Sequence, residues 1–148
     1  MSYLICHVQK FKANDVKGTQ IHNQRESVNS KNKDINEDRT ILNYDLHNEK
    51  HINYNHKVKE IIKDGYKVNK GIRKDAVILT STLITSDNEY FKMLPQEDQE
   101  KFFKQTYEFL KEKYGENNIV SATVHLDETT PHMHLCSVPL TEDGRLSA

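Results

Sequence analysis

Two stretches of alternating polar and apolar residues constrain the fold of this 148-residue chain more than any other feature. Residues 119–126 (IVSATVHL) and 132–140 (HMHLCSVPL) both alternate as strands do, because successive side chains of a strand point to opposite faces. Residues 127–131 (DETTP), between them, are of turn-forming types. The pattern therefore predicts a hairpin of two strands with one apolar face and one polar face.

The polar face of this hairpin carries three histidines within ten residues. His132 and His134 share a face because they are two positions apart, and His125 stands just before the turn. A tight turn would bring the three imidazoles together. Convergent imidazoles suit divalent ions such as Mn²⁺, Zn²⁺, Co²⁺ or Ni²⁺, so the pattern predicts a metal site.

The remaining segments predict a mixed architecture. The expected elements are a strand at 2–11, a helix at 54–64, a buried strand at 76–85, a short helix opened by a capping box at 86–89, and an amphipathic helix between Pro95 and Gly115. Residues 12–53 show no clear periodic element, which is unusual inside a compact domain unless function or a ligand orders the segment. We predict an α+β domain whose antiparallel sheet packs helices on one face and presents the histidines on the other.

Composition limits the class of protein. The length predicts a single domain, residues 1–148, and a turn signal at 142–144 leads us to expect that the domain continues beyond the last residue. The chain has no run of 18 apolar residues, its N-terminus does not resemble a signal peptide, and its two cysteines fit a reduced, cytoplasmic protein. Residues 1–74 carry a net charge of +6 and residues 75–148 a net charge of −7, so a polyanionic partner fits only the first half.

Three motifs resemble one protein family. The His-hydrophobe-His pattern at 132–134 is similar to that of the HUH endonuclease superfamily, which nicks single-stranded DNA. HLDETTPHMHL at 125–135 resembles the metal motif of the plasmid mobilisation and recombination relaxases, the Pre/Mob or MobV family. HNQR at 22–25 resembles the first motif of that family, and 36–46, which ends in NYDL, resembles the second. The match runs along the whole chain in order, and the resemblance implies that the end of the relaxase domain and the C-terminal region of a family member lie beyond the given residues.

The resemblance implies an activity and a cofactor. It implies metal-dependent nicking of one DNA strand at an origin of transfer, by a transesterification that leaves a covalent protein–5′-phosphate intermediate. By analogy, His125, His132 and His134 hold a metal that polarises the scissile phosphate. Mn²⁺ is the expected ion, with Mg²⁺ as the alternative, because three imidazoles favour Mn²⁺ whereas Mg²⁺ prefers oxygen ligands.

Two residues compete as the nucleophile. His22 resembles the residue that this family uses, and a neutral imidazole is nucleophilic at pH 7 because its ordinary pKa is about 6.5. Tyr44 is the alternative, because many HUH enzymes use a tyrosine, although its ordinary pKa of about 10 requires a metal or a base to ionise it. Glu128 could be a fourth metal ligand, but we favour a role in orienting or deprotonating the nucleophile.

The expected partner is plasmid origin-of-transfer DNA, as a single strand or a hairpin. Arg25 is expected to clamp a phosphate beside the nucleophile, because a guanidinium binds phosphate through two hydrogen bonds. Tyr44, Arg73 and Lys74 are further candidates for DNA contact. The resemblance also raises the possibility of a homodimer formed through a region absent from this chain.

Three alternatives remain open from the sequence. Another HUH enzyme, such as a rolling-circle replication initiator or a transposase, would share the histidine motif. A metal-dependent hydrolase of small substrates would form no covalent DNA adduct. A truncated, non-catalytic fragment would bind origin DNA without nicking it.

Overall fold

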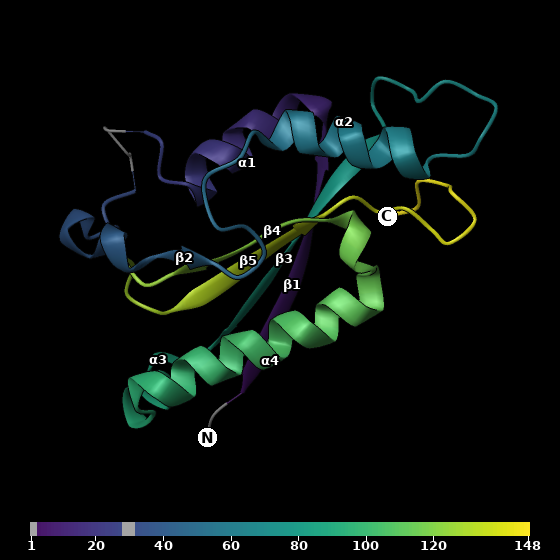
Figure 1. The fold of residues 1–148 in the computed structure, drawn as a ribbon. Coiled ribbons are helices and arrows are strands. Elements are labelled where there is room, and N and C mark those ends of the chain that lie inside the picture. The colour runs from purple at the N-terminus through teal and green to yellow at the C-terminus, as the bar shows by residue number, and fades with distance from the viewer. Residues whose placement is uncertain (1–2, 28–31) are drawn as a thin grey trace.

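The computed structural model describes residues 3–27 and 32–148 of the chain. Its centre is a five-stranded antiparallel sheet with the strand order β1-β3-β5-β4-β2 (Figure 1). The strands are β1 (Leu4–Lys12), β2 (Tyr44–Asp45), β3 (Val77–Ser86), β4 (Ile119–His125) and β5 (His132–Ser137). The predicted α+β class is confirmed, and so is the β4–β5 hairpin. Ser2, at the start of the first predicted strand, lies outside the described residues.

In the part of the chain that the structure describes, four α-helices and three 3₁₀ turns connect these strands. They are η1 (Ala13–Asp15), α1 (Val16–Asn23), η2 (Glu37–Leu42), α2 (Tyr54–Gly65), α3 (Asn88–Met93), α4 (Gln96–Tyr114) and η3 (Glu116–Asn118). The predictions of α2, α3 and α4 are confirmed. Asp87 caps α3, one residue later than the predicted capping box, because its carboxylate accepts a hydrogen bond from the Tyr90 backbone N–H. Within the described ranges, no helix combines the length and the apolar character that crossing a membrane requires.

The prediction that residues 12–53 hold no regular element is wrong, because α1 and β2 both lie there. The positions of α1 that face the interior are Val16, Gln20 and Asn23, so its buried side is mostly polar. The Gln20 carboxamide oxygen accepts a hydrogen bond of 2.8 Å from the Tyr54 backbone N–H at the start of α2. Hydrogen bonds rather than an apolar stripe hold this helix, and hydrophobic periodicity therefore misses it.

The two faces of the sheet are covered differently (Figure 1). The aromatic side of α4 and the short helix α3 pack on one face, against side chains such as Met133 and Leu135. The expectation of helices on one face is incomplete, because α1 and α2 cover part of the other face through Val16, Tyr54 and Val58. The last turn of α1 in this second layer lies against the histidines, through His22 and the backbone of Asn23.

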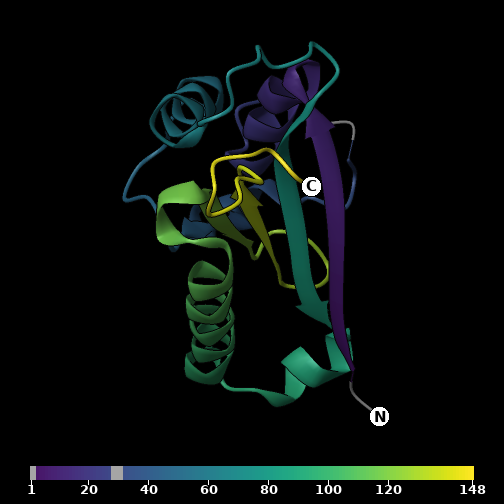
Figure 2. The same ribbon diagram turned by 90° about the vertical axis from the view of Figure 1, so that its right-hand side faces the viewer.

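Strand β1 forms one edge of the sheet and pairs with β3 alone (Figure 2). Most of its residues are exposed. The register places His7 opposite Leu83 on β3, and Leu83 opposite His134 on β5. Directly opposite residues of neighbouring strands share a face, so the face that carries the histidines extends as far as β1.

Replacing Phe103 with alanine tests the orientation of α4. Phe103 is 0% exposed and stacks on Phe91 with ring centroids 5.6 Å apart. We expect the free energy of unfolding to fall by about 3–5 kcal/mol, because the change leaves a core cavity. Urea denaturation followed by circular dichroism measures the loss. The matched control is Phe109→Ala on the same helix, where the ring is 63% exposed and the expected change is below about 0.5 kcal/mol. Equal losses in both variants would contradict this packing.

Candidate active site

Three imidazoles converge at the end of the β4–β5 hairpin. His125 on β4 lies directly opposite His132 on β5, and His134 is the next residue on the same face. The ring centroids are 5.2 Å apart for His125 and His132, 5.3 Å for His125 and His134, and 5.0 Å for His132 and His134. The structure thus brings together the three histidines that the sequence singled out.

Backbone carbonyls orient two of these rings. The Nε2 atom of His125 lies 2.9 Å from the carbonyl oxygen of Asn23, and Nδ1 of His132 lies 2.9 Å from that of Thr130. Because a carbonyl oxygen only accepts, both ring nitrogens must donate. The opposite nitrogens, Nδ1 of His125 and Nε2 of His132, lie 3.3 Å apart. Two nitrogens oriented in this way fit adjacent ligands of one divalent ion.

Two overlapping groups of side chains offer ligand atoms within 4.8 Å of one another. One group is His22, His125 and His134, and the other is His125, Glu128 and His132. His125 belongs to both. The structure therefore places His22, and Glu128 as the sequence allowed, beside the predicted ligands, and this His/Glu cluster could hold a metal ion.

Burial keeps two of the rings neutral. It lowers the pKa of His125 to about 3 and that of His134 to about 2, and the neighbouring positive groups act in the same direction. Both imidazoles therefore keep a lone pair for an ion across the physiological range.

His132 behaves differently because of Glu128. Burial opposes its charge, but the hydrogen bond to Glu128, 3.0 Å from Nε2, raises the pKa of His132 above its usual value. The same bond holds the pKa of Glu128 at about 2, so this carboxylate is charged and a weak base. Glu128 is thus suited to holding His132 and to attracting a cation.

His22 lies in the last turn of α1, next to the cluster. Its ring centroid is 5.6 Å from that of His125 and 5.5 Å from that of His134. Partial burial and the positive charge of Arg25 lower the pKa of His22, so the ring is neutral at pH 7. The structure therefore places a neutral imidazole, on an exposed residue, beside two of the candidate metal ligands.

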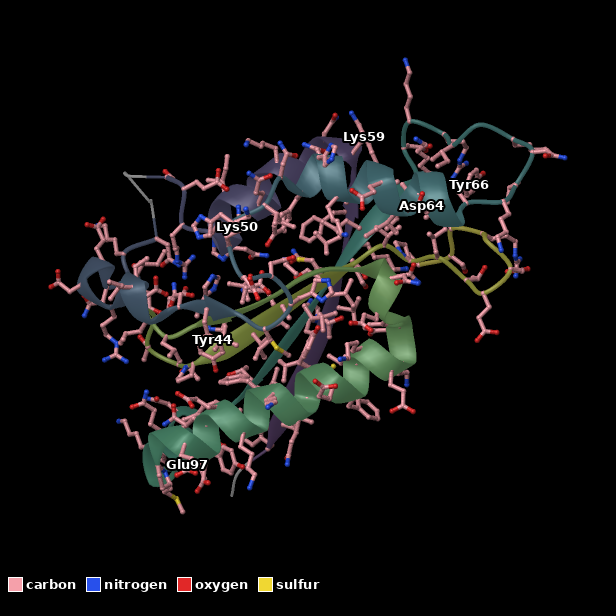
Figure 3. The ribbon with its side chains drawn as sticks, in the orientation of Figure 1. Tyr44, Lys50, Lys59, Asp64, Tyr66 and Glu97 are labelled. Atoms are coloured by element: carbon pink, nitrogen blue, oxygen red, sulfur yellow. The ribbon has the colours of Figure 1, made fainter. Side chains whose placement is uncertain are left out.

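Tyr44 lies on the other side of the sheet (Figure 3). It pairs with Val124 on β4 and packs into the apolar cluster beneath α4. Burial and the nearby Glu100 raise the pKa of Tyr44 to about 12. The alternative of Tyr44 as nucleophile is therefore not supported, because its ring is on the wrong face and difficult to ionise.

Arg25 is engaged within the protein, which differs from the expected phosphate clamp. It stands after α1 with a left-handed backbone (φ 52°). Its Nε and Nη2 atoms donate to the two oxygens of Asp127, both at 2.9 Å, and Nη2 also contacts Glu128 at 3.0 Å. Nη1 donates to the carbonyl oxygen of His22 at 2.9 Å. Most of its donors are thus used to fix the nucleophile candidate and the acidic turn.

Asp127 is the residue that sequence reasoning missed, because its type is common in turns. Its side chain is fully buried and accepts hydrogen bonds from Arg25, Thr40 and Asn43. Despite burial, these bonds hold the pKa of Asp127 well below its usual range. One sequence signal could have identified Asp127. It is an acidic residue within the histidine motif, while the first motif supplies Arg25 and the second supplies Asn43 as possible partners.

Arg73 and Lys74 are not brought to the cluster. Both are exposed in the loop between α2 and β3, and Arg73 pairs with Asp75 at 3.5 Å. This loop lies at the far end of the sheet from the β4–β5 turn (Figure 1). That Arg73 and Lys74 contact DNA stays a prediction, and such a contact would involve a part of the DNA away from the histidine cluster.

Comparison with known proteins identifies the family. Residues 1–148 match the Mob_Pre family, which is described as plasmid recombination enzyme. The chain belongs to this family. It is 49% identical over 146 residues to the plasmid recombination enzyme type 2 of Staphylococcus aureus strain Mu50, and 45% identical to the plasmid recombination enzyme of a Bacillus species. These matches cover 99% of the chain but only 34% and 35% of the relatives, so the chain spans about a third of their length.

A solved Mob_Pre structure has the same fold. It is the MobM relaxase domain bound to plasmid pMV158 oriT DNA, a Mn-bound crystal structure. The TM-score is 0.92 at 40% sequence identity, and the match covers 99% of this chain and 74% of that one. A second Mn-bound complex of the same domain matches with a TM-score of 0.90. The His/Glu cluster described above offers both imidazole nitrogens and a carboxylate oxygen, and carboxylate oxygen is a ligand that suits Mn²⁺.

Mn²⁺ should stabilise the folded chain. An ion at one hundred times its dissociation constant adds about 2.7 kcal/mol to the free energy of unfolding, because the unfolded chain lacks the assembled site. We expect Tm to rise with Mn²⁺ and to return to its starting value with excess chelator. The rise should disappear in His134→Ala and persist in His56→Ala, whose side chain is 80% exposed on α2. The same rise in both variants would argue against the histidine cluster as the site.

Replacing Asp127 with asparagine should lower the free energy of unfolding at pH 7 by about 3 kcal/mol, because it leaves the Arg25 charge less well paired. The pKa of Asp127 is lower in the folded chain than in the unfolded one. Its stabilising effect is therefore complete above the unfolded pKa of about 3.9, and is lost as the pH falls towards the folded value. Urea denaturation between pH 7 and pH 2 should show the gap between parent and variant narrowing below about pH 4. A constant gap would contradict the assignment.

Proposed function

We propose that this chain is the catalytic part of a relaxase that nicks one strand of plasmid DNA at an origin of transfer. The observation that carries the proposal is the position of the neutral His22 ring, 5.5 Å and 5.6 Å from two rings of the imidazole cluster. A nucleophile and a cation site this close can act on one phosphate. Membership of the plasmid recombination family and the likeness to a DNA-bound relaxase domain support the same chemistry.

In the proposed reaction, a ring nitrogen of His22 attacks the scissile phosphorus. A nitrogen–phosphorus bond forms while the bond from phosphorus to the 3′ oxygen breaks, so the energy of the phosphodiester is kept in a phosphoramidate. The imidazole loses its proton, and the departing 3′ oxygen gains one to become a hydroxyl. The reverse reaction rejoins the strand.

His125, His132 and His134 are the proposed metal ligands. When bound, Mn²⁺ would draw charge from a non-bridging phosphate oxygen and so make the phosphorus more open to attack. Mg²⁺ fits these nitrogen donors less well. The carbonyl of Asn23 fixes the ring of His125, and that of Thr130 fixes the ring of His132.

Glu128 and Arg25 are proposed as positioning residues. With a pKa of about 2, Glu128 is a poor proton acceptor, so of the two expected roles we retain orientation rather than deprotonation. Arg25 joins the backbone carbonyl of His22 to the carboxylates of Asp127 and Glu128. This network holds the nucleophile at a fixed distance from the cation site.

The partner is proposed to be single-stranded or hairpin DNA of an origin of transfer. Residues 1–74 carry the positive charge that a polyanion requires, and we place the reaction in the bacterial cytoplasm, where plasmids reside. Residues 1–148 would make up part of the relaxase domain. A homodimer through a further region stays a prediction.

Nicking of supercoiled plasmid tests the proposal directly. With Mn²⁺ and a plasmid that carries the pMV158 origin, we expect the chain to produce open circles, and His22→Ala to lower the rate roughly a thousandfold or more. His56→Ala serves as the control for loss of an exposed histidine. If the parent leaves the plasmid supercoiled while shifting origin DNA on a gel, the chain is a binding fragment and not a nicking enzyme.

Acid treatment of the covalent adduct identifies the nucleophile. A phosphoramidate to histidine is cleaved in acid, whereas a phosphotyrosine ester survives, so we expect the protein–DNA adduct to disappear after mild acid. Tyr44→Phe should still form the adduct. An acid-stable adduct that Tyr44→Phe abolishes would point instead to another type of HUH chemistry, and nicks without any adduct would indicate a hydrolase.

A further inference from the structure

A cavity of about 410 Å³ opens beside the imidazole cluster, between α1 and strands β1 and β3. His22 and His134 form part of its wall. Under the proposed function, the scissile phosphate lies against these same two side chains. The cavity, which we call the β1–α1 cavity, is therefore continuous with the place where the reaction occurs.

The register of the sheet explains how β1 reaches this site. Gln9 on β1 lies opposite Ser81 on β3, and Ser81 lies opposite Cys136 on β5. Cys136 is two residues from His134, so all of these side chains emerge on the histidine face. With strands about 4.8 Å apart, Gln9 stands about 10 Å from β5, and the side chain between them on this face is the small Ser81.

Two carboxamides of the cavity wall are exposed to solvent and available to a ligand. The side chains of Gln9 and Asn14 make no hydrogen bond to any residue of the described ranges, 3–27 and 32–148. A carboxamide offers an acceptor and a donor side by side, which matches the edge of a nucleobase, adenine above all. Phe11, half-buried in the same wall, adds an aromatic surface of the kind on which bases stack.

The larger cavity beside β2, of about 540 Å³, is a weaker candidate. Its asparagines are already engaged in holding the fold. Asn43 binds Asp127 and the backbone N–H of Leu126, and Asn48 binds Asp45. These groups have less capacity left to recognise a ligand.

We propose that the β1–α1 cavity receives the base of a nucleotide that flanks the scissile phosphate, and that Gln9 and Asn14 read the edge of that base. The inference rests on the proposed function and adds a specificity site to it. It assigns to the edge strand β1 a role in choosing where the DNA is cut.

Gly18 provides a way to fill the cavity without disturbing the fold. Gly18 lies in the wall of the β1–α1 cavity, and a Cβ atom added to Gly18 would meet no atom within 4 Å. Leucine at this helical position also has a higher helix propensity than glycine. The matched control is Gly71→Leu, because Gly71 has equally open surroundings in the loop between α2 and β3.

The test uses single-stranded pMV158 origin oligonucleotides, intact or with one abasic site on either side of the nick. Affinity is measured by fluorescence anisotropy, and nicking with Mn²⁺ on gels. For the parent, one of the two abasic positions should weaken binding about tenfold. Gly18→Leu should bind the intact strand about tenfold more weakly than the parent does, and an abasic site at that same position should not weaken its binding further. Gly71→Leu should behave like the parent. The double variant Gln9→Ala, Asn14→Ala should lose preference among the four bases there.

The outcomes separate the two proposals. If the parent neither binds nor nicks the intact oligonucleotide, the proposed function is overturned and this inference with it. If the parent nicks normally but Gly18→Leu keeps the full sensitivity to both abasic sites, the inference alone is overturned. Unchanged base preference in the double variant has the same consequence.

Discussion

The buried carboxylate of Asp127 is the interaction on which the candidate site depends. It accepts hydrogen bonds from Arg25, Thr40 and Asn43, which come from two separate parts of the chain, the end of α1 and the segment before β2. A buried charge costs several kcal/mol unless it is paired, so these partners are held at fixed positions around it. The backbone carbonyl of Asp127 also accepts the N–H of Asn36. The acidic turn therefore joins the end of α1 and the segment before β2 to the histidine hairpin.

The residues around Asp127 differ in charge, and the charged ones position the neutral ones. Arg25 connects Asp127 to the backbone of His22 and to Glu128. Glu128 in turn holds His132, while burial keeps His125 and His134 neutral. The result is two neutral rings, His125 and His134, beside a His132 ring that is hydrogen-bonded to the Glu128 carboxylate, which attracts a cation. The His22 ring lies next to them.

Sequence patterns predicted the architecture well where the physical signal was local. Alternation along 119–126 and 132–140 gave the hairpin and the shared face of His132 and His134. The apolar stripe of α4 and the glycine that follows it predicted both ends of this helix to within one residue. The same reasoning missed α1, because its buried positions include Gln20 and Asn23 and its stability comes from hydrogen bonds to α2 and β5.

By itself the sequence predicted that three histidines lie together on one face of a hairpin, because strand periodicity and motif spacing are properties of neighbours along the chain. The tertiary structure decided which other side chains lie around them. It placed Tyr44 on the far face, beneath α4, and it turned Arg25 inward to Asp127 instead of outward to solvent. These outcomes depend on contacts between residues about 80 to 100 positions apart, and no local pattern encodes such contacts.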